Sequence, residues 1–597
     1  MCIRLIAGVC FSLLFSGASL LAAQEQSLPA QQADQSTPVH AVTRVTVQGV
    51  VRNAVSGEPL PRALVQIEGD ADTGTLTDGE GHFEIPNVPA GPQTIRIVKP
   101  GYRDRPYATE ETGLQAEGPA HSVLLAAQMP DLIFSLSPNC AIHGHIELST
   151  GDPADGINLV LVKQVVRSGR AIWAQEAFTR TNGDGTYRFG GLPDGIYAVY
   201  TQPALESEPA VSLVAAASAA KVARSGYASV FYPDARELSG ASRIRLSGGS
   251  QAEANFLLPL EPFYPVTAVA TTQSDPTGAG KASQQGGYTA VVMDASGHLL
   301  PYFAQYDQTT HTLQANLPDG TYSLVVRGFV RPQSEGDFIV DRISFPLGQS
   351  RSNALAGSTE FTVAGHAVTG LRVPLGPPQT ASVRLRLVHT GEGPPNAVLS
   401  GNNATEFVNL GLDAADGIPL NGGDSVWSMD NAPDTISFTA QPGLYWLNVF
   451  LPRKGVCAGS FNAGSFNLAH EPLPMSLAAS PPPMEFTLSD DCGTMALTLP
   501  PTLAGFLPGE EPFYTVYVVP DFDTVQTLPP MTMHPSSGAT LSLDGLAPGS
   551  YHVYMFDSPV HLEYRNPAAL SALPVAGQPV TVSAGATSNL VLEAPEH

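Results

Sequence analysis

The stretch TNGDGTYRFGGLPDGIYAVY, residues 181–200, holds the pattern that decides the fold. Asn-Gly and Asp-Gly open it, an alternating apolar segment follows, and a Pro-Asp-Gly turn leads into a second alternating segment. Asn-Gly and Asp-Gly are typical of tight hairpin turns, because the central positions of such turns need a positive φ. Alternation of apolar and polar residues indicates strands with one buried face. The stretch therefore predicts two strands joined at a corner.

The same corner recurs at intervals along the whole chain. It ends in a glycine each time, and the five glycines are Gly91, Gly195, Gly320, Gly443 and Gly549. Their successive separations are 104, 125, 123 and 106 residues, a spacing typical of whole domains and too long for a solenoid repeat. The recurrence therefore predicts five tandem units of similar fold.

A tyrosine follows four of these glycines by two positions. A tyrosine at the start of a strand can bury its ring and return its hydroxyl to upstream backbone, as in the tyrosine corner of Greek-key sandwiches. We expect the glycine to supply a positive φ at the corner. The predicted structural tyrosines are Tyr197, Tyr322, Tyr445 and Tyr551.

Each unit also closes with a further alternating segment, such as LIFSLSP at 132–138 and NLVLEAP at 589–595. Markers at the start, middle and end of the units predict an all-β fold of about five tandem Ig-like or prealbumin-like β-sandwich modules, with little helix. The predicted modules span 45–129, 130–260, 261–377, 378–487 and 488–597. The second is expected to carry a short helical insertion, the alanine-rich segment 207–226.

The N-terminus indicates export. Residues 1–23 contain one basic residue, Arg4, and a long apolar run, which predicts a secretory signal peptide cleaved after Ala23. An uncleaved anchor is the alternative. Residues 24–44 are rich in Gln, Pro and Ser and are expected to form a disordered leader. No later apolar run is long enough for a transmembrane segment, so we expect a periplasmic, outer-surface or secreted protein.

Charge and cysteine content narrow the possible partners and the means of stabilisation. The formal net charge is −25, from 29 Lys and Arg against 54 Asp and Glu, which argues against nucleic acid and anionic membrane surfaces as partners. Three cysteines remain after the predicted cleavage. Cys457 and Cys492 lie in one region and form a possible disulfide, and Cys140 is expected to be a buried thiol.

The first unit resembles a known domain family. Its markers are the opening strand VQGVV, the segment GEPLPRALVQI, the T-D-G-x-G turn, the P-x-G corner and the closing KPGY, all within residues 47–102. This combination is similar to the carboxypeptidase regulatory-like domain, a transthyretin-like sandwich of bacterial exported proteins within the carbohydrate-binding-like fold. The resemblance implies a fold and an exported location. It implies no peptidase activity, because the regulatory domain carries no catalytic residues.

Two patterns could ligate a metal. His389 and Glu392 form a His-x-x-Glu pair, but no α/β pattern surrounds them, as a zinc carboxypeptidase would need. Alternation places His143, His145 and Glu147 on one face of a strand, where two imidazoles and a carboxylate could hold a divalent cation. A solvated strand face is the competing interpretation for these three residues.

Two acidic loops could also bind a cation, but turn chemistry is the favoured explanation for both. TDGEG offers Asp78 and Glu80, and TNGDG offers Asn182 and Asp184. Calcium takes six to eight oxygens, and each loop supplies two side chains before the chain enters a strand. We therefore interpret both loops as hairpin turns.

Aromatic residues provide the one ligand-contact candidate. In GLYWLNVF, residues 443–450, alternation turns Trp446 away from the core, toward a neighbouring module or toward a ligand. No catalytic motif and no cofactor motif is identified. We predict a non-catalytic exported protein with a binding role, toward glycan or protein, or a spacer role at the cell envelope. The alternatives are a peptidase or glycosidase with a site built from loops, and an accessory component of an envelope transport system.

Overall fold

The structure is a computed structural model. It describes residues 43–597 apart from 69–72, 105–119, 127–128, 207–222, 273–287, 296, 298, 308, 330–353, 378–379, 390–403, 416–423, 427–433, 439, 441–442, 453–454, 477–479, 500–513, 534–539, 558–559 and 594–597. The predicted signal peptide and the predicted leader up to residue 42 lie outside the described residues. Arg44, assigned to the leader, instead begins the first strand.

The chain folds as an all-β protein with several separate hydrophobic cores. Five large clusters of buried side chains follow one another in sequence, within residues 45–136, 140–258, 266–375, 381–488 and 495–592; Val525 also joins the fourth cluster. We call the five corresponding segments modules one to five. Among the described residues there is one α-helix, the five-residue α2 (Pro567–Ser571), and no helix long and apolar enough to cross a bilayer.

Module one is a sandwich of two four-stranded sheets, ordered β4-β1-β8-β6 and β3-β2-β5-β7. Its strands are β1 (Arg44–Asn53), β2 (Leu64–Ile67), β3 (Gly74–Leu76), β4 (His82–Pro89), β5 (Gly91–Val98), β6 (Tyr102–Asp104), β7 (Ala120–Leu125) and β8 (Leu132–Pro138). β8 pairs in parallel with β1, so module one extends to Pro138. The predicted boundary at residue 129 was therefore too early.

Module two pairs the sheet β11-β10-β13-β16 with the sheet β12-β9-β17, and β18 also pairs with β9. Its strands are β9 (Cys140–Leu148), β10 (Asn158–Arg167), β11 (Arg170–Arg180), β12 (Thr186–Leu192), β13 (Gly195–Thr201), β14 (Ala204–Leu205), β15 (Arg224–Tyr227), β16 (Ile244–Leu246), β17 (Gln251–Glu253) and β18 (Phe256–Leu258); a 3-10 turn, η2, covers Leu238–Gly240. Most of the predicted helical insertion lies outside the described residues, but its end is strand β15.

Module three has one continuous strand order, which begins with β14 and β15 of module two: β14-β15-β19-β22-β21-β20-β23-β24, with β25 beside β19. Its own strands are β19 (Leu260–Thr271), β20 (Tyr288–Asp294), β21 (Leu299–Asp307), β22 (Thr312–Leu317), β23 (Gly320–Phe329), β24 (Ala354–Val363) and β25 (Val368–Pro374). β21 pairs with β20 along its first half and with β22 along its second half. One strand therefore joins both layers of this module.

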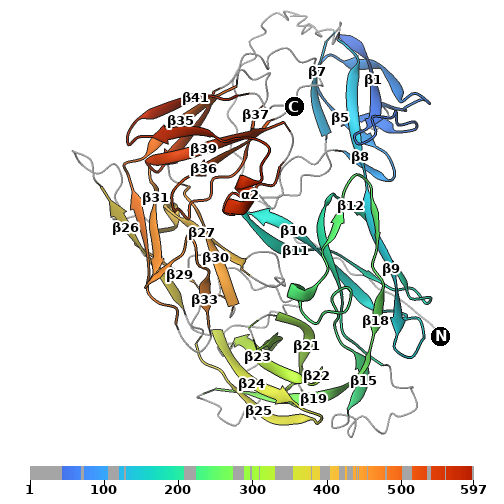
Figure 1. The fold of residues 1–597 in the computed structure, drawn as a ribbon, viewed down its shortest axis with the longest axis vertical. Coiled ribbons are helices and arrows are strands. Elements are labelled where there is room, and N and C mark those ends of the chain that lie inside the picture. Colours follow the sequence, from blue (N-terminus) through green and yellow to red (C-terminus); the bar gives the residue numbers. More distant parts are fainter. Residues whose placement is uncertain are drawn as a thin grey trace, which may run out of the picture. The chain divides into compact units, whose positions relative to one another are not determined.

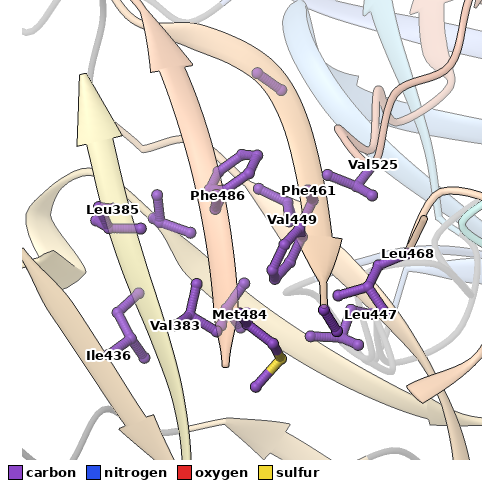
Figure 2. Close-up of a cluster of buried hydrophobic side chains, with 14 of the residues drawn as sticks. Val383, Leu385, Ile436, Leu447, Val449, Phe461, Leu468, Met484, Phe486 and Val525 are labelled. Carbon is purple, nitrogen blue, oxygen red and sulfur yellow. The ribbon is translucent and has the colours of Figure 1, made fainter. Parts of the chain in front are cut away.

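Module four again has two sheets, β29-β26-β34-β31-β32 and β28-β27-β30-β33. Its elements are β26 (Ala381–Val388), η4 (Ala404–Glu406), β27 (Asn409–Ala414), β28 (Asp424–Val426), β29 (Thr435–Phe438), β30 (Gly443–Phe450), β31 (Cys457–Ala463), β32 (Phe466–Asn467), β33 (Leu473–Met475) and β34 (Met484–Ser489). Figure 2 shows its core, where Phe461 and Phe486 pack with ring centroids 5.0 Å apart. Val525, from the module five segment, is part of the same cluster.

Module five combines β38-β35-β41 with β37-β36-β39-β40. Its strands are β35 (Gly493–Thr498), β36 (Tyr514–Pro520), β37 (Met531–Met533), β38 (Leu541–Leu546), β39 (Gly549–Phe556), β40 (Gln578–Val582) and β41 (Thr587–Val591). β36 is buried on both faces, because Val516 and Val518 belong to the module core while Tyr517 and Val519 form a second cluster with Tyr564. A disulfide between Cys457 and Cys492 links β31 of module four to the start of module five.

Among the described residues, the tyrosine that follows the corner glycine donates a hydrogen bond to the carbonyl four residues upstream in modules two, three and five. The hydroxyl of Tyr197 lies 2.6 Å from Pro193 O, that of Tyr322 lies 3.0 Å from Pro318 O, and that of Tyr551 lies 2.7 Å from Ala547 O. All three rings are buried. The bond holds the turn against the first residues of the next strand. Tyr445 packs at the margin of the module four core.

Two different physical constraints, backbone conformation and close approach of a side chain, require glycine at the corners. Gly91 has a φ of 115°, in the region that favours glycine, and φ is also positive at Gly443 and Gly549. Gly195 and Gly320 do not have a positive φ, which corrects our expectation for them. At Gly320 a Cβ atom would lie 2.8 Å from the Tyr322 hydroxyl, so close approach of the tyrosine ring, and not backbone conformation, excludes a side chain there.

Removing one corner hydroxyl tests its energetic role. Tyr551→Phe keeps the buried ring and deletes the bond to Ala547, so we expect module five to lose about 1 kcal/mol of stability and its unfolding midpoint to fall by a few degrees in calorimetry. Tyr554→Phe, on the same strand β39, is the control, because the Tyr554 hydroxyl makes no hydrogen bond to protein within the described residues. Equal effects of the two substitutions would contradict the assignment.

The buried tyrosines also predict alkaline sensitivity. Burial raises the pKa of Tyr322 and of Tyr551 above the value of about 10 that tyrosine has in an unfolded chain. The folded state therefore binds the phenol proton more tightly than the unfolded state does. The free energy of unfolding is highest below pH 10 and falls as the pH rises further. Thermal unfolding followed from pH 8 to 11.5 should show this fall, and the Tyr322→Phe/Tyr551→Phe double variant should show a shallower one.

A candidate binding groove on module two

Strands β10 and β11 form a hairpin (Figure 1), and β10 carries buried side chains on both of its faces. Leu159 and Leu161 point into the module core, while Val160 and Val162 point to the outer face. Part of that outer face is covered, because Tyr200 and Phe231 stack over it with ring centroids 4.8 Å apart. The remainder, toward the end of the sheet where β10 begins and β11 ends, is open.

The open part forms a groove of about 520 Å³, within the range of small-molecule sites. Val160, 2% exposed, lines it, and Phe178, directly across the strand pair from Val160, is 75% exposed. The remaining lining residues are polar: Asn158, Gln175, Thr179, Arg180 and Gln202. An exposed phenyl ring beside a buried apolar residue, with carboxamides around it, suits a ligand that has both an apolar face and hydroxyl or amide groups.

Trp446, the predicted ligand-contacting aromatic, is covered by a side chain of module two. The guanidinium carbon of Arg170 lies 4.1 Å from the centre of the Trp446 ring, a cation–π contact. Nη2 of Arg170 donates a hydrogen bond to Ala469 O at 2.7 Å. Beside this contact, Arg167 pairs with the buried Asp413 at 2.9 Å, and Asn448 also donates to Asp413. This arrangement occupies one face of the indole with protein.

The turn between β10 and β11 is also held by module five. Ser168 and Gly169 have φ values of 50° and 75°, as a two-residue hairpin turn requires. Arg565 donates from Nε to Ser168 O at 3.0 Å and from its backbone N to Gly169 O at 3.0 Å. A Cβ atom on Gly169 would lie 2.6 Å from the Tyr564 ring, so only glycine fits. We call the contacts of residues 167–170 with modules four and five the hairpin-tip junction.

The junction places two guanidinium groups near one another in a partly dehydrated setting. Burial, and secondarily the positive charge of Arg565, lower the pKa of Arg170 to about 9, so the group is still charged at neutral pH. The electron-rich face of Trp446 and the carbonyl of Ala469 compensate for part of the lost hydration.

The predicted metal candidates on β9 do not gather their ligand atoms around a common point. Nδ1 of His143 lies 2.9 Å from Ala252 O, and the backbone N of His145 donates to Asn255. Glu147 is exposed at the solvent side of the strand. In the part of the chain that the structure describes, the ligand-type side chains that do converge are a different set.

That set is His389, Asp490 and Asp491, whose ligand atoms lie within 4.8 Å of one another. β26 and β34 are parallel neighbours, so the residues that follow their last positions lie side by side. Nδ1 of His389 is 2.8 Å from the carboxylate of Asp490, which is fully buried, and 3.9 Å from that of Asp491. The sequence pairing of His389 with Glu392 is not described, because Glu392 lies outside the described residues.

The acidic loops use their carboxylates within their own turns. Asp78 accepts hydrogen bonds from the backbone N of Glu80 and of His82, each at 2.9 Å. Asp184 accepts from the hydroxyl and the backbone N of Thr186, and these bonds lower the pKa of Asp184. These oxygens therefore cap hairpin turns.

The cysteines fall into two chemical states. Cys457 and Cys492 form a disulfide, and Cys140 is a free, buried thiol. Burial raises the pKa of Cys140, so the thiol is protonated and unreactive at neutral pH.

Comparison with known proteins identifies the first module. Residues 46–119 match the family model of the carboxypeptidase regulatory-like domain. Module one is therefore a domain of this kind, and it begins a multi-module β-sandwich chain. A search of curated proteins gave no match.

Several solved structures are similar to parts of the chain at low identity. The Bacillus anthracis TIE protein is 10% identical over 55% of this chain and 50% of its own, with a TM-score of 0.15, so the chain spans about half of that relative. A minor pilin of Streptococcus agalactiae is 13% identical over 36% and 95%, with a TM-score of 0.18. Two B repeat units of the Staphylococcus aureus collagen binding protein are 10% identical over 70% and 93%, with a TM-score of 0.12. At these values the similarities assign no activity to the chain.

Phe178 was not among the residues predicted to contact a ligand. Those residues were a tryptophan and aromatics near the corners, whereas Phe178 lies in the polar run QEAFTR on an edge strand. A register shift between Leu161 and Val162 also changes which β11 residues face outward. A large aromatic in an otherwise polar strand was the available signal.

The hairpin-tip junction can be tested with a matched pair of glycines. Gly169→Ala places a Cβ at positive φ, which costs about 1–2 kcal/mol, and forces it against Tyr564, which adds about 1–3 kcal/mol. Gly151→Ala, at a φ of 88° with open space around the Cβ position, carries only the first cost. Calorimetry should show a larger fall in the unfolding midpoint for Gly169→Ala. Equal falls would mean that the tip does not contact modules four and five in solution.

Proposed function

We propose that the protein is an exported, non-catalytic binding protein of the cell envelope, and that the groove beside Phe178 is where its partner, glycan or protein, binds. The observation that carries this proposal is the 75% exposure of Phe178 beside a buried residue, Val160. Burial of an exposed phenyl ring by a bound partner is favourable, because it removes apolar surface from water. Its surroundings are polar enough to orient such a partner.

The chemistry of the groove supports binding rather than catalysis. A catalytic site needs a nucleophile, an acid or a base within hydrogen-bond reach of the reacting atoms. The described residues of the groove lining offer carboxamides, one threonine hydroxyl and one guanidinium, and among them there is no carboxylate, imidazole or thiol. The converging set His389, Asp490 and Asp491 lies in a different module.

A spacer role is the second candidate, and the hairpin-tip junction favours it. Contacts such as Arg167–Asp413 and Arg565–Ser168 connect positions 246 and 397 residues apart in sequence. Such contacts restrict module two relative to modules four and five, as a spacer of fixed geometry would need. The spacer role and the binding role are compatible, because they use opposite ends of one hairpin.

Binding to envelope material tests the proposal. The full chain without its predicted signal peptide should co-sediment with an envelope fraction of the source organism, and Phe178→Ala should weaken this binding about tenfold, as truncation of a central aromatic contact does. Phe303→Ala is the matched control, since Phe303 is also exposed, at 70%, but lies on β21 of module three. Binding that is unchanged in Phe178→Ala, or equally weakened in Phe303→Ala, would refute the groove as the binding site.

A further inference from the structure

The hydrogen-bonding groups of the groove point to one class of ligand. Asn158, Gln175 and Gln202 each present a carboxamide, which can donate and accept at once. Within the described residues these three side chains make no hydrogen bond to protein, so they are available to a ligand. Sugar hydroxyls have the same double character and match such groups.

The charges of the groove favour an uncharged ligand. Among the described residues no carboxylate lines it, and Nε of the one cationic side chain in that set, Arg180, already donates to Gly156 O at 2.8 Å. The net charge of −25 would repel an acidic polymer. Arg180, which already donates one hydrogen bond within the protein, would be its cationic partner in the groove. A cationic ligand would find no anionic partner among the described lining residues. Neutral hydroxyl groups leave no charge unpaired.

The shape fits a chain lying on the sheet. Phe178 and Gln175 come from β11, which is the edge strand of its sheet, while Gln202 follows β13 on the other side of β10. The groove therefore runs across three strands and opens at the sheet edge. A ligand longer than the groove can continue past that edge without meeting the sheet.

We infer that the Phe178 groove binds a neutral polysaccharide chain, with one sugar ring stacked on Phe178 and neighbouring hydroxyls hydrogen-bonded to Asn158, Gln175 and Gln202. This inference rests on the proposed binding function of the groove. The apolar C–H face of a pyranose ring is the complement of the electron-rich face of the phenyl ring. The carboxamides then fix the orientation of the ring by pairing its hydroxyls.

Affinity gel electrophoresis of the full chain without its signal peptide tests the ligand class. The neutral probes are hydroxyethyl cellulose, xylan, galactomannan and pullulan, and the acidic probes are alginate and polygalacturonate. We expect at least one neutral polymer to retard the wild type, with about tenfold weaker retardation of Phe178→Ala. Phe178→Trp should retain binding, because the stacking surface is kept, and Phe303→Ala should behave as wild type.

Retardation by acidic polymers alone, by no polymer, or equally in Phe178→Ala would overturn the inference. Binding to the envelope fraction after chemical or enzymatic treatment distinguishes a failure of the glycan inference from a failure of the proposed binding function. Periodate oxidation of the fraction destroys vicinal diols of sugars, and proteinase K destroys proteins. Phe178-dependent binding that is lost after periodate supports the glycan. Phe178-dependent binding that is lost only after proteinase K keeps the binding function and refutes the glycan, with a peptide paired to the edge of β11 as the partner.

Discussion

The hairpin of β10 and β11 is the element on which the rest of the structure depends. One face of β10 fills the core of module two with Leu159 and Leu161, and the other face holds Val160 and Val162. A strand buried on both faces cannot shift its register without exposing one of these sets. Both ends of the hairpin are therefore held in fixed positions relative to the module two core.

The two ends of this hairpin have different surroundings. At its tip, Arg170 stacks on Trp446 and the backbone carbonyls of Ser168 and Gly169 accept hydrogen bonds from Arg565. At its open end, Phe178 stands exposed beside Val160. Val160 and Arg167 are seven residues apart, or about 24 Å along a strand. A ligand at the groove would therefore leave the tip contacts intact.

The sequence predicted the all-β fold because strand alternation and corner chemistry are local. A tyrosine bonded to a carbonyl four residues upstream depends on a short segment, and that segment repeats with little change. The alternation of residues 132–138 marked them as a closing strand, but the predicted boundary at residue 129 left them out of module one, whereas β8 pairs in parallel with β1, far away in sequence. The different geometry of Gly195 and Gly320 depends on where the tyrosine ring lies, which a residue pattern does not specify.

The candidate site could be predicted only in part, for a related reason. Alternation correctly turned Trp446 away from its own core, but what covers it is Arg170, from a hairpin in another module. No local pattern specifies such a contact, since it depends on how modules two and four fold against one another. Phe178 is the converse case: its only local signal is one large aromatic in a polar strand segment, and its outward direction follows from the extra residue, Glu176, at the register shift in its own strand β11. The aromatic that local sequence favoured has one face covered by Arg170, and the one it passed over is exposed, because exposure is decided by tertiary packing rather than by residue type.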